Sequence, residues 1–301
     1  MEREPQFEGK EQGPLVKPSI RLEFLRHDKP LPKSPGQSAD KMPLAPESRG
    51  HAEEIGKTKN PDPTRAVAFG SPRVRSQETA LRQLLANEDW VTEETSLEEI
   101  EQGISDRMPV GGKLLVSEKL NYRSDANPDY AKVYQSHYAG AKDLVPFLFN
   151  ESDDLTVRLG DTEDFSYTRL AANVAELIKK YVGILPRWEQ LAEEKPETYG
   201  ENPELQRFLG THSTISESFL LKVIEKTQGR GAAQDFVNAL PDKNGIGFSD
   251  GISAVVDEFD GATKISITFH AQHWEIDENV LDEIISDRDQ LDAAARKNKK
   301  V

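Results

Sequence analysis

The 301-residue chain contains no cysteine. This absence excludes disulfide bonds, cysteine nucleophiles and thiolate metal sites. Long apolar runs are missing as well: the most compact apolar patch, residues 145–149, is far shorter than the ~20 residues that a membrane-spanning helix needs. Residues 1–18 are polar and lack the apolar stretch of a secretory signal. We therefore expect a cytoplasmic protein with no membrane partner.

Positively charged residues are fewer than negatively charged ones. Lysine and arginine total 38 against 53 aspartates and glutamates, which gives a formal net charge of −15. Such a surface repels nucleic acid on average, because binding it requires clustered lysine and arginine, so we expect no nucleic-acid partner. An anionic small molecule would need a local basic pocket set against this background.

Hydrophobic patterning predicts a β-α-β-α order at the start of the chain. Residues 20–25 alternate apolar and polar side chains as a strand does, and residues 64–69 form a second β-like run. Residues 46–56 and 71–86 carry the apolar spacing of helices, and each begins beside a proline. This order predicts an α/β fold with a mainly parallel central sheet flanked by helices.

The rest of the chain predicts one domain with an insert. An acidic and tyrosine-containing stretch gives no clear periodicity, and we interpret about residues 104–150 as a mostly helical insert over the active site. Later segments predict helices at 165–182, 214–227 and 277–297, a strand at 206–210, and strands at 253–259 and 264–270 joined by the hairpin signal Asp260-Gly261. We expect residues 1–18 to be a flexible tail, 19–295 a single domain and 296–301 a frayed basic tail.

Polar side chains follow three of the predicted strands. They are Arg26-His27, Ser71 to Arg75, and Thr211-His212. Because the carboxyl ends of parallel strands meet at one edge of a sheet, we expect these groups to converge there. Two histidines and two or more arginines would form the local basic pocket that the acidic background requires.

These residue types are suited to phosphoryl transfer. An imidazole can attack phosphorus and form a covalent phosphohistidine. Arginines hold phosphoryl oxygens through planar, bidentate contacts, and a second histidine adds hydrogen bonds where negative charge develops. A carboxylic acid is still needed to protonate the leaving oxygen and then to activate water.

Several segments resemble the histidine phosphatase superfamily, which has the phosphoglycerate mutase-like fold. Arg26-His27 resembles the family's Arg-His-Gly motif, residues 44–52 its Leu-Thr-x-x-Gly-x-x-Gln-Ala helix start, residues 71–80 its Ser-x-x-x-Arg-x-x-Gln-Thr-Ala motif, and Thr211-His212 its second Thr/Ser-His. The resemblance covers about residues 20–225. It implies that Arg26, His27, Arg75 and His212 form a phosphate pocket.

The resemblance also implies an activity. It implies metal-independent hydrolysis of a small-molecule phosphate ester through a phosphohistidine on His27, with no cofactor. For the acid, residues 97–103 resemble the family's Leu-x-Glu-x-x-x-Gly segment, which singles out Glu99. Its rivals are Glu98, Glu101 and Asp106. The acid phosphatase branch of the family has an aspartate after the second histidine, where this chain has Ser213.

The chain departs from the family pattern beside its first motif. Asp28 stands in place of glycine, where it is expected to add negative charge beside the phosphate. Lys29 is expected to offset Asp28 or to contact phosphate. Arg73 lies two residues from Arg75, so on a helix it would face elsewhere, and we expect it at the surface.

Three alternatives remain open at this stage. One is a phosphoglycerate mutase-type phosphotransferase, which uses the same phosphohistidine. Another is a catalytically weak phosphoryl-binding protein on the same fold. The third is a metal-dependent hydrolase using His27, Asp28, His270 and His273; we favour no metal there, because the pair His270 and His273 lacks a convincing third ligand. The sequence does not indicate the oligomeric state.

Overall fold

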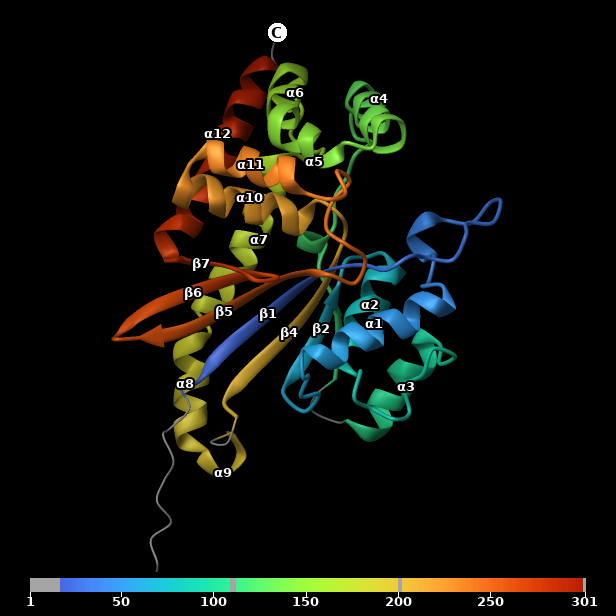
Figure 1. Cartoon of the computed structure of the whole chain (residues 1–301), viewed down its shortest axis with the longest axis vertical. Helices are drawn as coiled ribbons and strands as arrows, with labels where there is room; N and C mark the ends of the chain where they lie inside the picture. The colour runs from blue at the N-terminus through green and yellow to red at the C-terminus, as the bar shows by residue number, and fades with distance from the viewer. Residues whose placement is uncertain (1–16, 109–111, 200–201, 300–301) are drawn as a thin grey trace, which may run out of the picture.

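The computed structural model of the chain describes residues 17–108, 112–199 and 202–299, and its centre is a seven-stranded sheet (Figure 1). The strands lie in the order β3-β2-β4-β1-β5-β6-β7. Their bounds are Ser19–Arg26 (β1), Ala66–Gly70 (β2), Leu114–Val116 (β3), Glu204–Thr211 (β4), Gly251–Phe259 (β5), Ala262–Phe269 (β6) and Gln272–Ile276 (β7). The expected tail at residues 1–18 falls almost entirely outside the described residues.

The sheet is parallel on one side and antiparallel on the other. Strands β3, β2, β4 and β1 run parallel, whereas β5, β6 and β7 pair antiparallel to their neighbours. The expected α/β fold is confirmed. The hairpin at Asp260-Gly261 is confirmed too, with positive φ angles of 52° and 78° at its two central residues. The sequence analysis missed β7, whose alternating residues follow a two-residue turn directly after β6.

Different helices cover the two faces of the sheet (Figure 1). One face carries α1 (Pro46–Thr58), α2 (Val74–Leu84) and α3 (Leu97–Arg107). The other face carries α7 (Tyr167–Val182) and α10 (Ile215–Gln228), with α11 (Arg230–Ala239) and α12 (Glu278–Asn298) packed against them. Among the described residues, no helix is long and apolar enough to cross a membrane.

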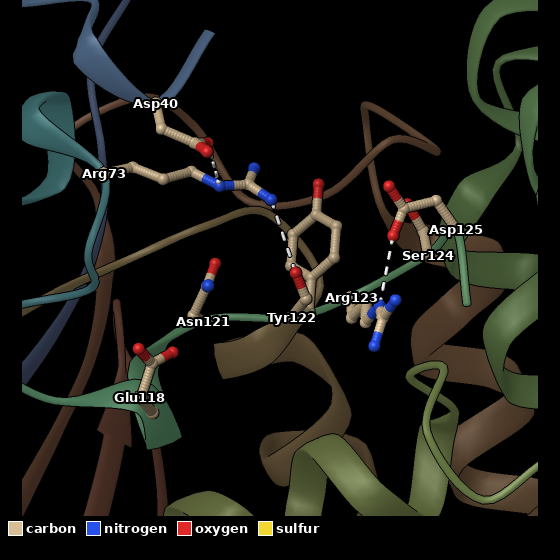
Figure 2. Close-up of a pocket in the computed structure, with 8 residues that line it drawn as sticks. All are labelled: Asp40, Arg73, Glu118, Asn121, Tyr122, Arg123, Ser124 and Asp125. Atoms are coloured by element: carbon tan, nitrogen blue, oxygen red, sulfur yellow. Dashed lines mark hydrogen bonds and ion pairs between the residues drawn. The ribbon is translucent and has the colours of Figure 1, made fainter. Parts of the chain in front are cut away.

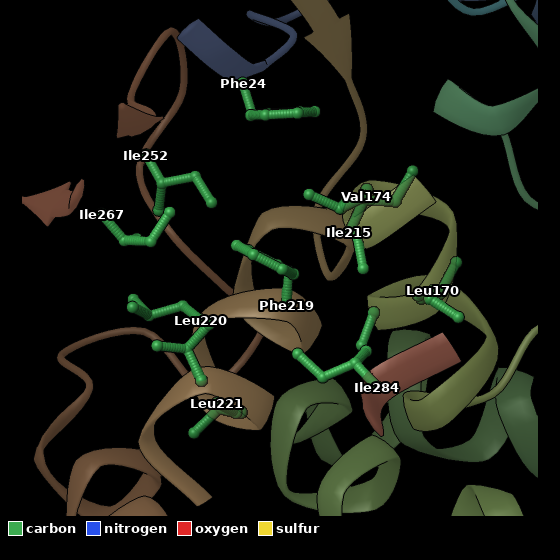
Figure 3. Packing of buried hydrophobic residues seen from close by; sticks show 14 of the residues in the cluster. Phe24, Leu170, Val174, Ile215, Phe219, Leu220, Leu221, Ile252, Ile267 and Ile284 are labelled. Atoms are coloured by element: carbon green, nitrogen blue, oxygen red, sulfur yellow. The ribbon is translucent and has the colours of Figure 1, made fainter. Parts of the chain in front are cut away.

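The alternation in β1 divides the core into two layers. Leu22 and Phe24 face the larger cluster under α7 and α10, and Leu25 faces the smaller cluster under α2 and α3. Figure 3 shows Phe24 packed beside side chains of the antiparallel strands and of the helices on that face. The period of two that predicts the strand therefore also assigns each side chain to one layer.

Only part of the segment expected to be a helical insert, about residues 104–150, is helical. Its first part contains the end of α3 and the edge strand β3, which belong to the sheet and its helical layer. The helical part is made of α4 (Pro128–Gln135), the π-helix η3 (Ser136–Ala141), α5 (Leu144–Phe147), the π-helix η4 (Leu148–Ser152) and α6 (Asp153–Leu159). A three-residue strand is too short to give a periodic signal, which explains the difference.

The remaining elements are short or lie at the periphery. They are the 3₁₀ turns η1 (Ala39–Lys41) and η2 (Glu118–Leu120) and the helices α8 (Leu185–Glu194) and α9 (Pro196–Tyr199). Helix α12 runs through Asn298, so the basic residues expected to fray are helical up to that point. The Asn298 side chain donates a hydrogen bond to the Val157 carbonyl at 2.9 Å, which ties this end to α6.

A close approach between α2 and β4 positions the strand ends. A Cβ added to Gly210 would lie 1.9 Å from the Ser76 carbonyl oxygen. Glycine therefore allows the first turn of α2 to rest on the end of β4. The residues before that turn, from Ser71 to Arg75, are thereby held beside the ends of β1 and β4.

We predict that Gly210→Ala destabilises the protein by about 2 kcal/mol or more, because the added methyl group overlaps backbone atoms that cannot rotate away. Urea unfolding followed by circular dichroism measures the change. The matched control is Gly231→Ala in α11, where an added Cβ has nothing within 4 Å and helix propensity favours alanine by about 0.5–1 kcal/mol. Equal stabilities of the two variants would contradict this account of the packing.

Candidate active site

The carboxyl ends of three parallel strands meet through backbone hydrogen bonds. The His27 amide, directly after β1, donates to the Thr211 carbonyl of β4 at 2.9 Å. The Ser71 amide, directly after β2, donates to the Gly210 carbonyl at 3.2 Å. The polar side chains that follow these strands therefore lie at one edge of the sheet, as the sequence predicts for parallel strands.

His27 is held with one ring nitrogen as a donor and the other as an acceptor. Its Nδ1 lies 2.7 Å from the carbonyl oxygen of Asp28. Because a carbonyl oxygen only accepts hydrogen bonds, Nδ1 carries the proton. Nε2 accepts a hydrogen bond from Nε of Arg75 at 3.0 Å, so its lone pair faces a guanidinium group. This tautomer presents Nε2 as a nucleophile.

The surroundings keep both histidines neutral. Burial is the largest cause, and together with the positive charges of Arg75, Arg26 and Arg73 it lowers the pKa of His27 from 6.5 to about 3, although the hydrogen bond to the Asp28 carbonyl opposes this change. Burial likewise lowers the pKa of His212 well below its usual value, with His27 and the two nearby arginines adding to the effect. A neutral imidazole is the form that can attack an electrophile.

His212 packs beside His27 and is fixed by hydroxyl groups. The two rings meet edge to face with centroids 5.0 Å apart. Nε2 of His212 lies 2.8 Å from Oγ of Ser71, which in turn lies 2.7 Å from Oγ of Ser76. Nδ1 of His212 is buried and has no hydrogen-bond partner in the part of the chain that the structure describes. The ring therefore has one nitrogen available to a ligand oxygen.

Arg26 is anchored by a loop on the antiparallel side of the sheet. Its guanidinium donates to the Ile246 carbonyl and lies 4.3 Å from the centroid of the Phe248 ring. The buried carboxyl group of Glu217 holds the same loop by accepting from the Ile246 amide at 2.6 Å. The exposed Lys29 places its ammonium group 5.6 Å from the Phe248 centroid, next to Arg26.

Arg73 is part of this site, contrary to the surface position that the sequence analysis expects. It is the N-cap residue of α2, with extended backbone angles of φ −85° and ψ 125°, so the helical spacing relative to Arg75 does not apply to it. Its guanidinium pairs with Asp40 at 3.2 Å and lies 4.8 Å from the Tyr122 ring centroid. The Tyr122 ring in turn meets the His212 ring edge to face at 5.5 Å.

A pocket of about 420 Å³ opens beside these rings (Figure 2). Its wall contains Glu118, which follows the edge strand β3. The backbone at this point continues the sheet, because the Ser117 amide donates to the Gly70 carbonyl at 2.9 Å. Glu118 therefore stands at a fourth parallel strand end and brings an exposed carboxyl group to the pocket. The remaining lining residues are Asp40, Arg73, Asn121, Tyr122, Arg123, Ser124 and Asp125.

Glu99, the carboxylate singled out by the sequence, has a different role. It forms a capping box at the start of α3, accepting from the Ser96 amide at 2.7 Å while the Ser96 hydroxyl accepts from the Glu99 amide at 3.2 Å. The hydrogen bonds that the Glu99 carboxylate accepts from the Ser96 amide and the Ser96 hydroxyl lower the pKa of this exposed group. The structure places Glu99 with the helix cap and not with the histidines, so it does not support Glu99 as the acid. Glu118 was missed because the three-residue strand before it is too short to give a periodic signal.

The carboxylate of Asp28 is turned away from the expected phosphate position. One of its oxygens lies 2.5 Å from Nδ1 of His51 and accepts from the Ser249 hydroxyl at 2.8 Å. Burial opposes ionisation, but these hydrogen bonds and one from the Lys29 amide outweigh it and lower the pKa of Asp28. The Asp28 amide donates to the Thr79 hydroxyl at 3.1 Å. These contacts fix Asp28 in place, and its backbone carbonyl in turn orients the His27 ring.

The residues of the metal alternative have separate partners. Asp28 contacts His51 and Ser249, whereas His270 lies 2.6 Å from a carboxylate oxygen of Asp250. Within residues 17–108, 112–199 and 202–299, no three histidine, cysteine, aspartate or glutamate side chains are grouped so that they could hold a metal ion.

Among known proteins, the chain is similar to solved structures but matches no family profile and no curated sequence. A structure described as mycobacterial hydrolase 2 is 14% identical, with coverage of 90% of this chain and 98% of that chain and a TM-score of 0.44. The native mycobacterial glucosyl-3-phosphoglycerate phosphatase is 15% identical, with coverage of 79% and 90% and a TM-score of 0.40. Bacillus stearothermophilus YhfR is 12% identical, with coverage of 81% and 94% and a TM-score of 0.41. The function proposed below rests on the side-chain geometry of this chain and not on these likenesses.

We predict that the His27 imidazole remains neutral, with the proton on Nδ1, between about pH 5 and pH 8. Nitrogen chemical shifts of ¹⁵N-labelled histidine measure both properties. Below pH 6.5 the unfolded chain binds a proton on His27 that the folded chain does not take up until about pH 3. The free energy of unfolding therefore falls as the pH drops through this window. A midpoint near 6.5 in the folded protein would contradict the prediction.

Proposed function

We propose that the protein is a phosphomonoester hydrolase that acts through a phosphohistidine on His27. The observation that carries the proposal is the geometry of the His27 imidazole: the Asp28 carbonyl holds its Nδ1, and its Nε2 lone pair faces Arg75 beside the buried ring of His212. A neutral imidazole nucleophile, surrounded by guanidinium groups in a chain of net charge −15, is suited to an electrophile that carries negative charge.

The first step transfers the phosphoryl group to the enzyme. Nε2 of His27 attacks phosphorus, an N–P bond forms, and the bond between phosphorus and the leaving oxygen breaks. Nδ1 keeps its proton and donates to the Asp28 carbonyl, which stabilises the positive charge that the ring gains. Arg26 and Arg75 supply positive charge to the phosphoryl oxygens, and Nδ1 of His212, which has no partner among the described residues, supplies a further polar contact.

Glu118 is the proton donor in this proposal. In its protonated form it delivers a proton to the leaving oxygen, and an alcohol departs. Its carboxylate then takes a proton from the water that attacks the phosphohistidine, so that inorganic phosphate leaves and His27 regains its lone pair. The exposure of Glu118 supports hydrolysis over transfer between sugars or acids, because a mutase must exclude water from the phosphoenzyme.

We expect His27→Ala to lower the turnover of an aryl phosphate by about 10³-fold or more, because the nucleophile is lost. Turnover is measured with a chelator present, and mass spectrometry of the enzyme quenched in alkaline denaturant, in which phosphohistidine is stable, tests for one added phosphoryl group on His27. The matched control is His273→Ala, an exposed histidine of β7, which should retain wild-type turnover. Unchanged turnover in His27→Ala, or a requirement for metal, would refute the phosphohistidine route.

We expect Glu118→Gln to lower kcat for an alkyl phosphate by about 10²- to 10⁴-fold, the usual contribution of a general acid. The loss should be smaller for an aryl phosphate, whose leaving oxygen needs less protonation. Glu99→Gln is the matched control, because glutamine at this position can still accept the capping-box hydrogen bond from Ser96, so both the fold and kcat should be retained. A larger loss of kcat in Glu99→Gln than in Glu118→Gln would reverse the assignment.

A further inference from the structure

Both guanidinium groups that line the pocket beside Tyr122, whose ring contacts His212, already have carboxylate partners (Figure 2). Arg73 pairs with Asp40 at 3.2 Å. Arg123 pairs with Asp125 at 3.3 Å and with Glu163 at 2.8 Å. A second anionic group on a substrate would have to displace a carboxylate of the protein from one of these arginines. The pocket is therefore poorly suited to a leaving group that carries a carboxylate.

The charge of the pocket differs from the charge around His27. The pocket wall contains the three carboxylates of Asp40, Glu118 and Asp125 against two guanidinium groups. The position for the phosphoryl group, by contrast, lies beside Arg75, whose Nε contacts His27, and near Arg26, and neither of these arginines lines the pocket. The two halves of a bound ester would thus meet opposite environments: the phosphoryl group a cationic one, and the rest of the molecule an acidic one.

The lining of the pocket offers hydrogen bonds instead of an apolar surface. Oδ1 of Asn121 is buried without a partner in the part of the chain that the structure describes, and Figure 2 shows this side chain extending toward Arg73. Ser124 supplies a hydroxyl group, and carboxylate oxygens accept hydrogen bonds from alcohols. A volume of about 420 Å³ lies in the usual range for small-molecule sites.

We propose that the leaving group is an uncharged, hydroxyl-rich alcohol, such as a sugar or another polyol. This inference rests on the proposed function, because the pocket becomes a leaving-group site only if His27 receives the phosphoryl group. Esters whose alcohol part bears a carboxylate are disfavoured by the occupied arginines and by the carboxylate excess. The same charges disfavour a phosphoglycerate mutase activity.

Two ligands of nearly equal shape test the proposal. Glycerol 3-phosphate and 3-phosphoglycerate differ at one carbon, which is a hydroxymethyl group in the first and a carboxylate in the second. Each is measured as a competitor of aryl phosphate turnover, so that a value is obtained whether or not the ligand is itself hydrolysed. We expect the inhibition constant of glycerol 3-phosphate to be lower by at least about fivefold, which corresponds to one unfavourable charge contact near water.

Asp40→Asn tests whether the occupied arginine is the cause. The Asp40 side chain is 63% exposed, so the fold should tolerate the change, and the substitution leaves Arg73 free to bind a carboxylate. In Asp40→Asn, the inhibition constant of 3-phosphoglycerate divided by that of glycerol 3-phosphate should fall toward one or below it. Glu193→Gln on α8, also an exposed carboxylate, is the matched control and should keep the wild-type ratio.

The outcomes separate this inference from the function on which it rests. Tighter binding of 3-phosphoglycerate to the wild type, failure of both ligands to compete, or an unchanged ratio in Asp40→Asn would overturn the leaving-group assignment. Absence of His27-dependent aryl phosphate turnover would instead remove the proposed function itself.

Discussion

The parallel pairing of β4 with both β1 and β2 is the constraint on which the site depends. It aligns the ends of the three strands in one register, so that Arg26 lies opposite Thr211 and Gly70 lies opposite Gly210. The residues that follow each strand must then leave the sheet at the same edge. Gly210 makes this possible at close range, because only a residue without a side chain lets the start of α2 rest on β4.

A cationic site in an acidic chain requires that nearby carboxylates be directed elsewhere. Asp28 shows how this is achieved: its side chain turns to His51 and Ser249, while its carbonyl faces His27. Glu217 is likewise engaged with the loop that anchors Arg26. Burial and the remaining guanidinium charges then keep His27 and His212 in the neutral form. The negative net charge therefore lies on the surface, and the strand ends remain positive.

The loop between η2 and α4 turns a charged strand edge into a pocket. Tyr122 lies between Arg73 and His212 and packs on Phe165, so the aromatic cluster that the sequence contains is partly core and partly pocket wall. The same segment brings Asn121 and Arg123 beside Glu118. The charge pattern of this wall, with each arginine paired to a carboxylate, separates the phosphoryl position from the position of the alcohol.

The sequence alone determined the β-α-β-α order at the start of the chain and the polar residues that follow β1, β2 and β4, because both depend on local periodicity and on the geometry of parallel sheets. It thereby identified Arg26, His27, Arg75 and His212 as neighbours. Only the tertiary structure decided the places of Arg73, Glu118, Glu99 and Asp28. The places of Arg73 and Glu99 depend on where a helix begins: Arg73 precedes the first turn of α2, and Glu99 takes part in the cap of α3. Glu118 follows a strand that is too short to give a pattern. Asp28 has partners 23 and 221 residues away in the sequence. The Glu99 side chain is directed by a local capping box, whereas the side chains of Arg73, Glu118 and Asp28 are directed by contacts that no local pattern encodes.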